Sequence, residues 1–341
     1  MPKRKERESD AVEAELPLAK YLASTEKRVR DRAIRSLSAF LLRSAKEEGL
    51  SMSSVELGKL WKGIFYCFWM SDKPLVQQAL AQELSTLVLR VAGYGEETGE
   101  ETGEETGEEK KESEPDAASA QARALTALDF YHGFWTTTES EWLGVDKFRV
   151  NKYYMLMRRF LHAGLELLRR HSWDAALVER FVTVMRGTDG PLASNNVKVP
   201  DSITYHVCDT FLDELESVVA EDAADVTIPI LSLLTPFLEL AATSTSKRVH
   251  ERVMTTVILP FLDACATQIK SKKTLDTYPA LLARVHADDD DGEFDDLDDK
   301  AQSLAAVRRT ILKAAFSIAS GSDTYAPSRR KLYALWQAEA A

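Results

Sequence analysis

The chain has 341 residues, of which 45% are hydrophobic and 28% are charged, and its formal net charge is −11 at pH 7. A hydrophobic fraction of this size supports a buried core and excludes a wholly disordered chain. The apolar stretches are short and interrupted, whereas a membrane helix needs about 20 apolar residues. The charged N-terminus also lacks the apolar region of a secretory signal. We therefore expect an intracellular protein with no membrane segment.

The negative charge is concentrated in two segments. Residues 96–114 contain ten acidic residues and two lysines, and residues 288–299 contain nine acidic residues and no basic one. Without these segments the rest of the chain carries a net charge of +6. The sequence thus predicts a mildly basic folded body with two acidic loops. That combination is common among proteins that act near nucleic acids, but it is not specific for them.

The first predicted helices follow a charged segment, residues 1–14, that is expected to be disordered. Apolar residues recur at helical spacing along Val29–Leu41, behind a start signal at Ser24 and Thr25. A second helix is expected over Val55–Met70, which includes the apolar run IFYCFWM. A helix that is apolar all round is either buried on every side or partly a docking surface. Its large aromatic side chains are predicted to be core: Trp61, Phe65, Phe68 and Trp69.

A third helix is expected after the turn at Ser71 and Asp72, which can cap it, with Pro74 in its first turn, where the missing N–H costs little. No segment shows the convincing alternation of apolar and polar residues that marks a strand. Further helices are expected, to within a few residues, at about 117–134, 146–171, 173–186, 202–220, 226–242, 246–268, 276–286, 299–319 and 327–338.

Three breaks divide these helices. The four-residue repeat at 95–109 and the aspartate-rich segment 287–298 should be solvated loops, and the turn-rich segment 187–202 should be a connection. We predict one domain over residues 15–340, interrupted by disordered acidic loops at 94–116 and 287–298.

An internal similarity bears on the architecture. STEKRVRDR at 24–32 aligns with STSKRVHER at 244–252, and both segments place a polar turn before a basic first turn and an apolar stripe. Paired antiparallel helices, repeated, form solenoids. The predicted fold is all-α, an irregular HEAT/armadillo-like α-solenoid of antiparallel helix pairs. A compact bundle is the alternative, because the other helix pairs show no obvious repeat.

No pattern in the sequence points to catalysis or to a cofactor. There is no glycine-rich phosphate loop and no His-Glu-x-x-His motif. The pair His206 and Cys208 fits packing better than metal binding, and Cys67, Cys208 and Cys265 fit buried thiols in a reducing compartment. A calcium-binding loop centred on Gly292 would lack its first and last ligands. We predict no enzymatic activity, no cofactor and no metal site.

Two rows of basic residues are the candidate binding surfaces. Arg28, Arg32, Arg35 and Arg43 fall within a sector of about 80° on the first long helix, opposite its apolar stripe. The second row lies on the helix from Asp146 to His171. Such rows can neutralise RNA phosphates or contact acidic partners, although solvated faces with local ion pairs are the alternative. The candidate contact residues are Arg28, Arg32, Arg35, Lys152, Arg158, Arg159, Arg169 and Arg170, with Lys73, on the turn after the second helix, as a weaker candidate.

Several segments resemble the ribosomal RNA processing protein 1 family of nucleolar factors for large-subunit assembly. They are LWKGIFYCFWMSDKPLVQQALAQELS (60–85), WLGVDKFRVNKYYMLMRRFL (142–161) and ITYHVCDTFLDELE (203–216), with LAKYLASTEKRVRDRAIRSL (18–37) and SRRKLYALW (328–336) in the same order. The block from Trp61 to Pro74 is the most specific. The resemblance spans about residues 15–340 and is interrupted at the acidic loops.

The resemblance implies a location in the nucleus and nucleolus and a role in early pre-60S particles, without enzymatic activity. It also implies large-subunit precursor rRNA and other assembly factors as partners, including Brix-domain and β-propeller proteins. The repeat at 95–109 looks peculiar to this chain. Many relatives carry a long charged C-terminal tail, and contacts made by such a tail are expected to be absent from this chain, which stops at Ala341.

We therefore predict a non-enzymatic scaffold, monomeric within the particle, that bridges assembly factors and pre-rRNA. The main alternative is a protein–protein adaptor with no direct RNA contact. A third option is an enzyme with an unrecognised site, which a deep polar pocket with convergent carboxylates or histidines would support.

Overall fold

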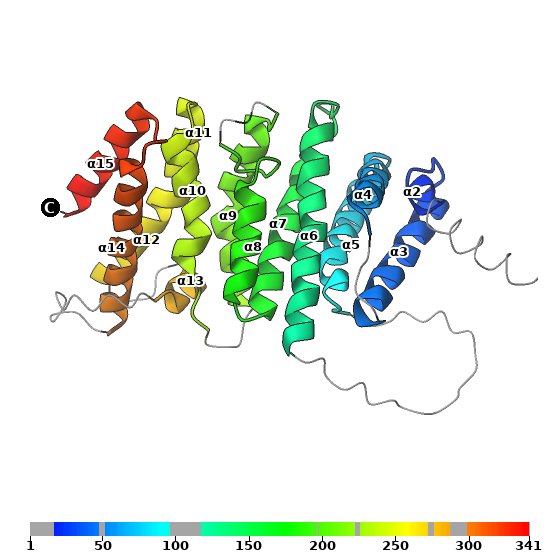
Figure 1. Cartoon of the computed structure of the whole chain (residues 1–341), viewed down its shortest axis with the longest axis horizontal. Helices are drawn as coiled ribbons and strands as arrows, with labels where there is room; N and C mark the ends of the chain where they lie inside the picture. Colours follow the sequence, from blue (N-terminus) through cyan, green and yellow to red (C-terminus); the bar gives the residue numbers. More distant parts are fainter. Residues whose placement is uncertain are drawn as a thin grey trace, which may run out of the picture. The chain divides into compact units, whose positions relative to one another are not determined.

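The computed structural model describes residues 17–47, 52–95, 117–194, 196, 198–221, 226–271, 276–286 and 299–340. In these ranges every regular element is a helix (Figure 1), which confirms the all-α prediction. The predicted disordered segment 1–14, residues 96–116 of the first acidic loop and the whole of the second lie outside the described residues.

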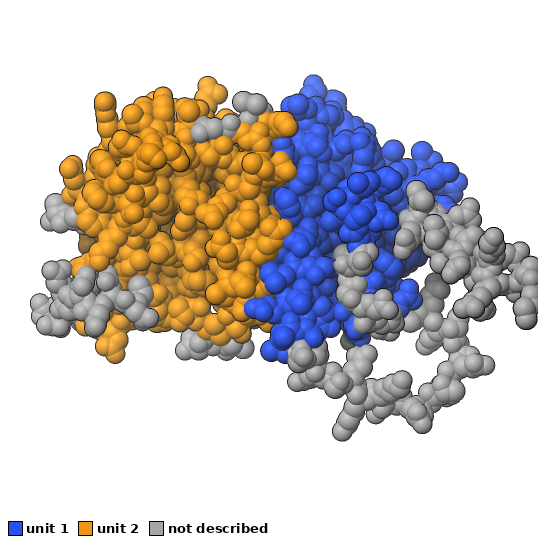
Figure 2. Space-filling model, in the orientation of Figure 1, with its two compact units in different colours: residues 1–163 blue, residues 164–341 orange. Residues whose placement is uncertain are grey.

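The chain divides into two compact units, residues 1–163 and 164–341 (Figure 2). The boundary falls inside α7 (Val150–Arg170). A single continuous domain and a solenoid arrangement of the helix pairs stay predictions. None of the helices in the described ranges carries an apolar stretch long enough to cross a bilayer.

The described residues of unit 1 form five complete helices and the first part of α7. They are α2 (Pro17–Leu22), α3 (Lys27–Glu47), α4 (Ser54–Trp69), α5 (Pro74–Val91) and α6 (Ala117–Trp142). Apart from the sequential contacts α2–α3, α4–α5 and α5–α6, each helix packs on the one after next: α2 on α4, α3 on α5 and α4 on α6.

The core of unit 1 is built around the aromatic residues of α4. Trp61 is 1% exposed, and its ring centroid lies 4.6 Å from that of Phe130 on α6. Phe134 on α6 stacks on Phe160 of α7 at 3.7 Å between ring centroids. The predicted core residues Phe65 and Phe68 are also buried, whereas Trp69, at the end of α4, is only half-buried.

The turn between α4 and α5 differs from the prediction. Pro74 does occupy the first turn of α5, but the N-cap residue is Lys73, and its side chain makes no capping hydrogen bond. The Ser71 hydroxyl donates instead to the carbonyl of Phe68, 2.7 Å away. The predicted capping role of Ser71 and Asp72 is therefore wrong, because Ser71 closes the preceding helix.

Unit 2 contains the end of α7 and the remaining helices. They are α8 (Ala175–Arg186), α9 (Asp201–Ala220), α10 (Ile230–Thr243), α11 (Lys247–Val253), the π-helical turn η1 (Met254–Ile258), α12 (Leu259–Lys270), α13 (Pro279–Arg284), α14 (Asp299–Ser320) and α15 (Ala326–Ala340). Helix α10 lies at the centre of the unit and packs on α8, α11, α14 and α15.

The helix predicted at 246–268 is present, but it contains the π-helical turn. Pro260 lies two residues after the end of this turn and has no N–H to donate. A proline therefore removes one bond of the α-helical ladder, and a wider turn before it accommodates the loss.

The two segments of similar sequence, 24–32 and 244–252, begin their helices with the same hydrogen bond. The Ser24 hydroxyl accepts a hydrogen bond from the Glu26 N–H at 3.2 Å, and the Ser244 hydroxyl accepts one from the Ser246 N–H at 3.2 Å. Helices α3 and α11 then start at equivalent lysines, Lys27 and Lys247. The prediction that both segments begin a helix is confirmed.

Candidate RNA- and partner-binding surfaces

The basic row on α3 lies on the exposed face of the helix. Its apolar stripe, including Ile34 and Leu37, is fully buried, whereas Arg28, Arg32 and Arg35 are all exposed. Arg28 and Arg32 form no ion pair with any residue that the structure describes, and Arg35 interacts electrostatically with Glu83 of α5. The row therefore presents largely uncompensated positive charge.

The excess of basic over acidic side chains in the described residues lies in unit 1. The described residues of unit 1 include 18 basic and 10 acidic side chains, and those of unit 2 include 17 of each. The described part of unit 1 thus carries a formal net charge of +8 and that of unit 2 carries none. A polyanion is attracted to the first unit more strongly than to the second.

The predicted row on α7 is not one continuous exposed surface. In unit 1, Arg158 and Arg159 are exposed, but Lys152 is only 7% exposed. In unit 2, Arg169 and Arg170 both bind the buried carboxylate of Glu166, with N–O distances of 2.6 Å. The structure therefore separates this row into an exposed pair, a buried lysine and an ion-paired cluster.

The Glu166 cluster is electrostatically well matched. Burial alone raises the pKa of Glu166, but hydrogen bonds from Arg169 and Arg170 outweigh that effect and hold the pKa below its ordinary value. Arg169 reaches both carboxylate oxygens, through Nε and Nη2. The two guanidinium groups therefore share one carboxylate.

Lys152 closes the end of α4. Its ammonium donates to the carbonyl oxygens of Phe68, Trp69 and Ser71 at 2.9, 2.7 and 2.7 Å. Burial lowers the pKa of Lys152 to about 8, and the nearby Arg149 adds to this lowering, so the ammonium form still predominates at neutral pH. Because these three bonds occupy every donor of the group, we leave Lys152 out of the proposed contact surface.

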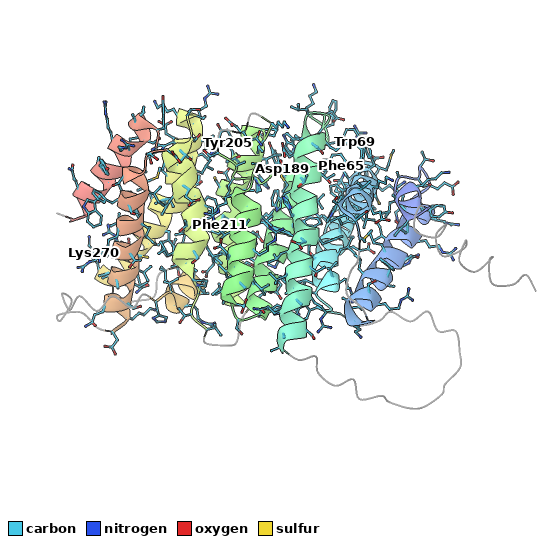
Figure 3. All side chains as sticks on the ribbon, in the orientation of Figure 1. Phe65, Trp69, Asp189, Tyr205, Phe211 and Lys270 are labelled. Carbon is cyan, nitrogen blue, oxygen red and sulfur yellow. The ribbon has the colours of Figure 1, made fainter. Side chains whose placement is uncertain are left out.

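A second buried cation completes the same helix end. Arg30, on the buried face of α3, donates to the Met70 carbonyl at 3.3 Å and to the carbonyls of Ser24 and Thr25 at 2.9 and 3.0 Å. The carbonyls of residues 68 to 71 are thus each met by one of two cations. We call Arg30, Lys152 and these four carbonyls the carbonyl clamp; Figure 3 labels Phe65 and Trp69 on the helix that it closes.

Sequence reasoning did not single out Arg30 or Arg149. Arg30 precedes Ile34 by four residues, so helical spacing places it on the buried face of α3. That spacing could have identified Arg30 as a buried cation. Arg149 places its guanidinium carbon 4.7 Å from the centroid of the Trp69 ring, a contact between residues 80 positions apart that no local pattern predicts. Lys73, the weaker candidate, is exposed on the turn that the clamp holds.

Potential metal ligands do not form a cluster in the described residues. Among the described residues, no three His, Cys, Asp or Glu side chains gather where they could hold a metal ion. A cavity of about 390 Å³ in unit 2 is lined by two acidic residues, Glu239 and Asp323, and by no histidine, and Glu239 is ion-paired with Arg186 at 3.1 Å. All three cysteines are free and buried, as predicted, and burial raises the pKa of the Cys67 thiol to about 12.

Comparison with known proteins decides the family. The family model described as nucleolar protein Nop52 matches residues 13–331, well over half of the chain. The chain belongs to the Nop52 family. The resemblance found in the sequence is thereby confirmed, because the curated relatives of this Nop52 chain are named ribosomal RNA processing protein 1 homologs.

These relatives are longer than the Nop52 chain. Homolog B of Mus musculus is 32% identical over 76% of this chain and 32% of its own length. Homolog A of Homo sapiens is 31% identical over 67% of this chain and 42% of its own length. Homolog A of Mus musculus is 30% identical over 84% of this chain and 49% of its own length. The chain thus spans less than half the length of each of these relatives.

Proposed function

We propose that this chain is a non-enzymatic ribosome biogenesis factor that acts in the nucleolus on early pre-60S particles. In this role it scaffolds assembly factors and precursor rRNA during processing of the large-subunit rRNA. Family membership supports the process, since the relatives are named for ribosomal RNA processing. The proposal includes a solenoid of antiparallel helix pairs, which would offer long faces to several partners at once.

The observation that carries the RNA contact is the exposed row Arg28, Arg32 and Arg35 on a unit with a formal net charge of +8 in its described part. A row of arginines along one helix can follow the phosphates of a strand without reading its bases. Arg158 and Arg159 are further proposed contacts on unit 1, and Arg169 and Arg170 are a separate proposed contact on unit 2. Lys73 belongs to a different surface, described below.

Ultraviolet crosslinking of the tagged protein in cells, followed by sequencing of the bound RNA, tests this proposal. We expect reads concentrated in large-subunit precursor rRNA and crosslinked peptides from α3. No recovered RNA, despite co-sedimentation with pre-60S factors, would replace the proposal with the adaptor that touches only protein. Brix-domain and β-propeller proteins are the proposed neighbours in either case.

A further inference from the structure

The exposed apolar side chains of unit 1 gather at one end. The described part of the unit exposes six large hydrophobic residues, and Val55 is the only one of them that lies away from this end. The other five lie in or beside the loops that join α2 to α3, α4 to α5 and α6 to α7. They are Tyr21 (51% exposed), Met70 (37%), Leu75 (79%), Leu143 (90%) and Phe148 (83%).

Printed contacts hold these three loops side by side. Arg30 binds the α2–α3 loop through Thr25 and the α4–α5 loop through Met70. Lys152, in the first turn of α7, binds the α4–α5 loop through Ser71, and Arg149 of the α6–α7 loop lies on the Trp69 ring. In Figure 1 these three loops lie at the same end of the helix pairs α2–α3, α4–α5 and α6–α7, at the top of the view. We call the surface formed by these loops the loop end.

The loop end is fixed in place before any partner arrives. Two buried cations and a cation–π contact anchor the backbone beneath the exposed side chains. A soluble surface rarely exposes several large apolar residues together unless they contact something. A rigid apolar surface also loses little conformational freedom on binding, which favours affinity.

The charge around the loop end is complementary to an acidic partner. Lys73 and Lys147 are exposed and form no ion pair with the part of the chain that the structure describes. Of the four neighbouring carboxylates, Asp31 pairs with Lys27 and Asp146 with Arg149. Glu26 and Asp72 are exposed in the same loops and offset part of the positive charge. The ammonium of Lys147 lies 5.1 Å from the Phe148 ring centroid, so positive charge and apolar surface are adjacent.

The exposed side chains favour a protein over RNA. RNA bases stack on aromatic rings and phosphates bind cations, but neither covers Leu75 and Leu143, the two aliphatic side chains that are 79% and 90% exposed. A protein segment with its own apolar residues buries such side chains, while acidic residues at its rim meet the lysines.

We propose that the loop end docks an acidic segment of a partner protein that carries large apolar side chains. This inference deepens the proposed function and rests on it, because it assigns one partner surface of the scaffold. It separates the two kinds of contact on unit 1: RNA along the α3 row, and protein at the loop end.

Site-specific photocrosslinking of the full chain in cells tests the assignment. The photoreactive residue p-benzoylphenylalanine replaces Leu143 in one variant and Ala122 in a matched control. Ala122 is exposed on α6 and about 30 Å along the helix from the loop. We expect about tenfold more protein crosslinking at position 143, a ratio that reflects specific over random contact. The crosslinked peptides should be acidic and contain Leu, Ile, Phe or Trp.

Charge variants in the Leu143 background complete the test. Lys73→Glu with Lys147→Glu should lower the crosslinking yield about fivefold or more, because rim charges steer association. Lys59→Glu with Lys270→Glu, two exposed lysines elsewhere, should leave it unchanged.

Four outcomes would overturn the proposal: nuclease-sensitive crosslinks to RNA, crosslinks to a second copy of this chain, equal yields at positions 143 and 122, and no effect of the loop-end charge variants. Sedimentation of the same variants distinguishes this failure from that of the proposed function. A chain that still enters pre-60S particles and crosslinks to rRNA, but shows no specific protein at position 143, contradicts the docking surface alone.

Discussion

Two buried cations, Arg30 and Lys152, bind the carbonyls at the end of α4, and neither forms an ion pair with a residue that the structure describes. The last carbonyls of a helix have no acceptor role inside the helix and carry the negative end of its dipole. Arg30 and Lys152 donate to the last carbonyls of α4, those of Phe68, Trp69 and the C-cap residue Met70, and to the following carbonyl of Ser71, and they place positive charge where the dipole favours it. Burial of each cation is therefore compensated by hydrogen bonds, and Asp72 and Asp146 add a favourable electrostatic interaction at Lys152.

Replacing Lys152 with methionine keeps most of the side-chain length but removes three hydrogen bonds. The carbonyls of Phe68, Trp69 and Ser71 would lose a buried charged donor, so we expect the free energy of unfolding to fall by about 2–4 kcal/mol. Chemical denaturation measures this. The matched variant Arg159→Met, at an exposed position of the same helix, should change it by less than about 0.5 kcal/mol. Equal effects of the two variants would mean that the clamp contributes nothing.

His250 gives the stability a pH dependence in the physiological range. It is 4% exposed, its Nδ1 lies 2.7 Å from the Ala241 carbonyl oxygen, and burial lowers its pKa below the ordinary value of 6.5. The unfolded chain therefore takes up a proton first as the pH falls. The free energy of unfolding should decrease as the pH drops through 6.5, and the decrease should stop below the folded-state pKa.

Urea unfolding at pH 7.5 and at pH 5.5, roughly one unit either side of the ordinary value for histidine, tests this expectation. His250→Gln retains an N–H that can reach the Ala241 carbonyl but does not titrate. The variant should lose part of the wild-type decrease in stability between the two pH values. The same decrease in both proteins would assign the pH dependence to other groups.

Two helical glycines in unit 1 face different surroundings. A Cβ added at Gly133 of α6 would lie 2.3 Å from Nε1 of the buried Trp61, whereas one added at Gly58 of α4 would meet nothing within 4 Å. Gly133→Ala should therefore destabilise unit 1 by about 1–3 kcal/mol through overpacking. Gly58→Ala should stabilise it by about 0.5–1 kcal/mol through helix propensity.

Thermal unfolding of the two glycine variants checks both signs. The substitution is chemically the same, so any difference reports the packing around Trp61. Stabilisation by Gly133→Ala would show that the contact between α4 and α6 relaxes readily, in conflict with the close approach of these helices.

At the level of elements, the sequence predicted most helices because their apolar residues repeat at helical spacing. It placed the end of α6 near residue 134, but the helix continues to Trp142. Thr136, Thr137 and Thr138 have low helix propensity, yet Thr138 and Trp142 are buried, and this tertiary packing overrides the local preference.

The candidate surfaces were predicted in part. The exposure of Arg28, Arg32 and Arg35 follows from their position opposite an apolar stripe, and the structure confirms it. The burial of Lys152 could not be predicted, since it depends on carbonyls more than 80 residues earlier in the chain. The loop end could not be predicted from the sequence either, because its apolar residues come from three segments that only the fold brings together.

At the scale of the whole molecule, charge is divided between the units. Only unit 1 carries excess positive charge in its described residues. Binding of the full chain to a single-stranded RNA oligonucleotide should therefore weaken with salt, and each phosphate contact contributes about 0.7 to the logarithmic slope.

Reversal of Arg28, Arg32 and Arg35 to glutamate should reduce the salt slope by about 2 and reduce sedimentation with pre-60S particles. Reversal of Arg248, Lys270 and Arg330, three exposed cations of unit 2, changes the net charge by the same amount. This control should preserve both properties. Equal losses in both variants would show that overall charge, and not the α3 row, governs binding.

The carbonyl clamp also has a consequence for synthesis of the protein. Its acceptors are residues 68–71 and one of its two donors is Lys152, so α2 to α5 are complete long before that donor is translated. In a nascent chain the carbonyls at the end of α4 cannot bind Lys152 until the start of α7 has emerged from the exit tunnel. The first unit therefore gains its final stability late, and truncations between α5 and α7 should yield chains that chaperones and proteases recognise as unfinished.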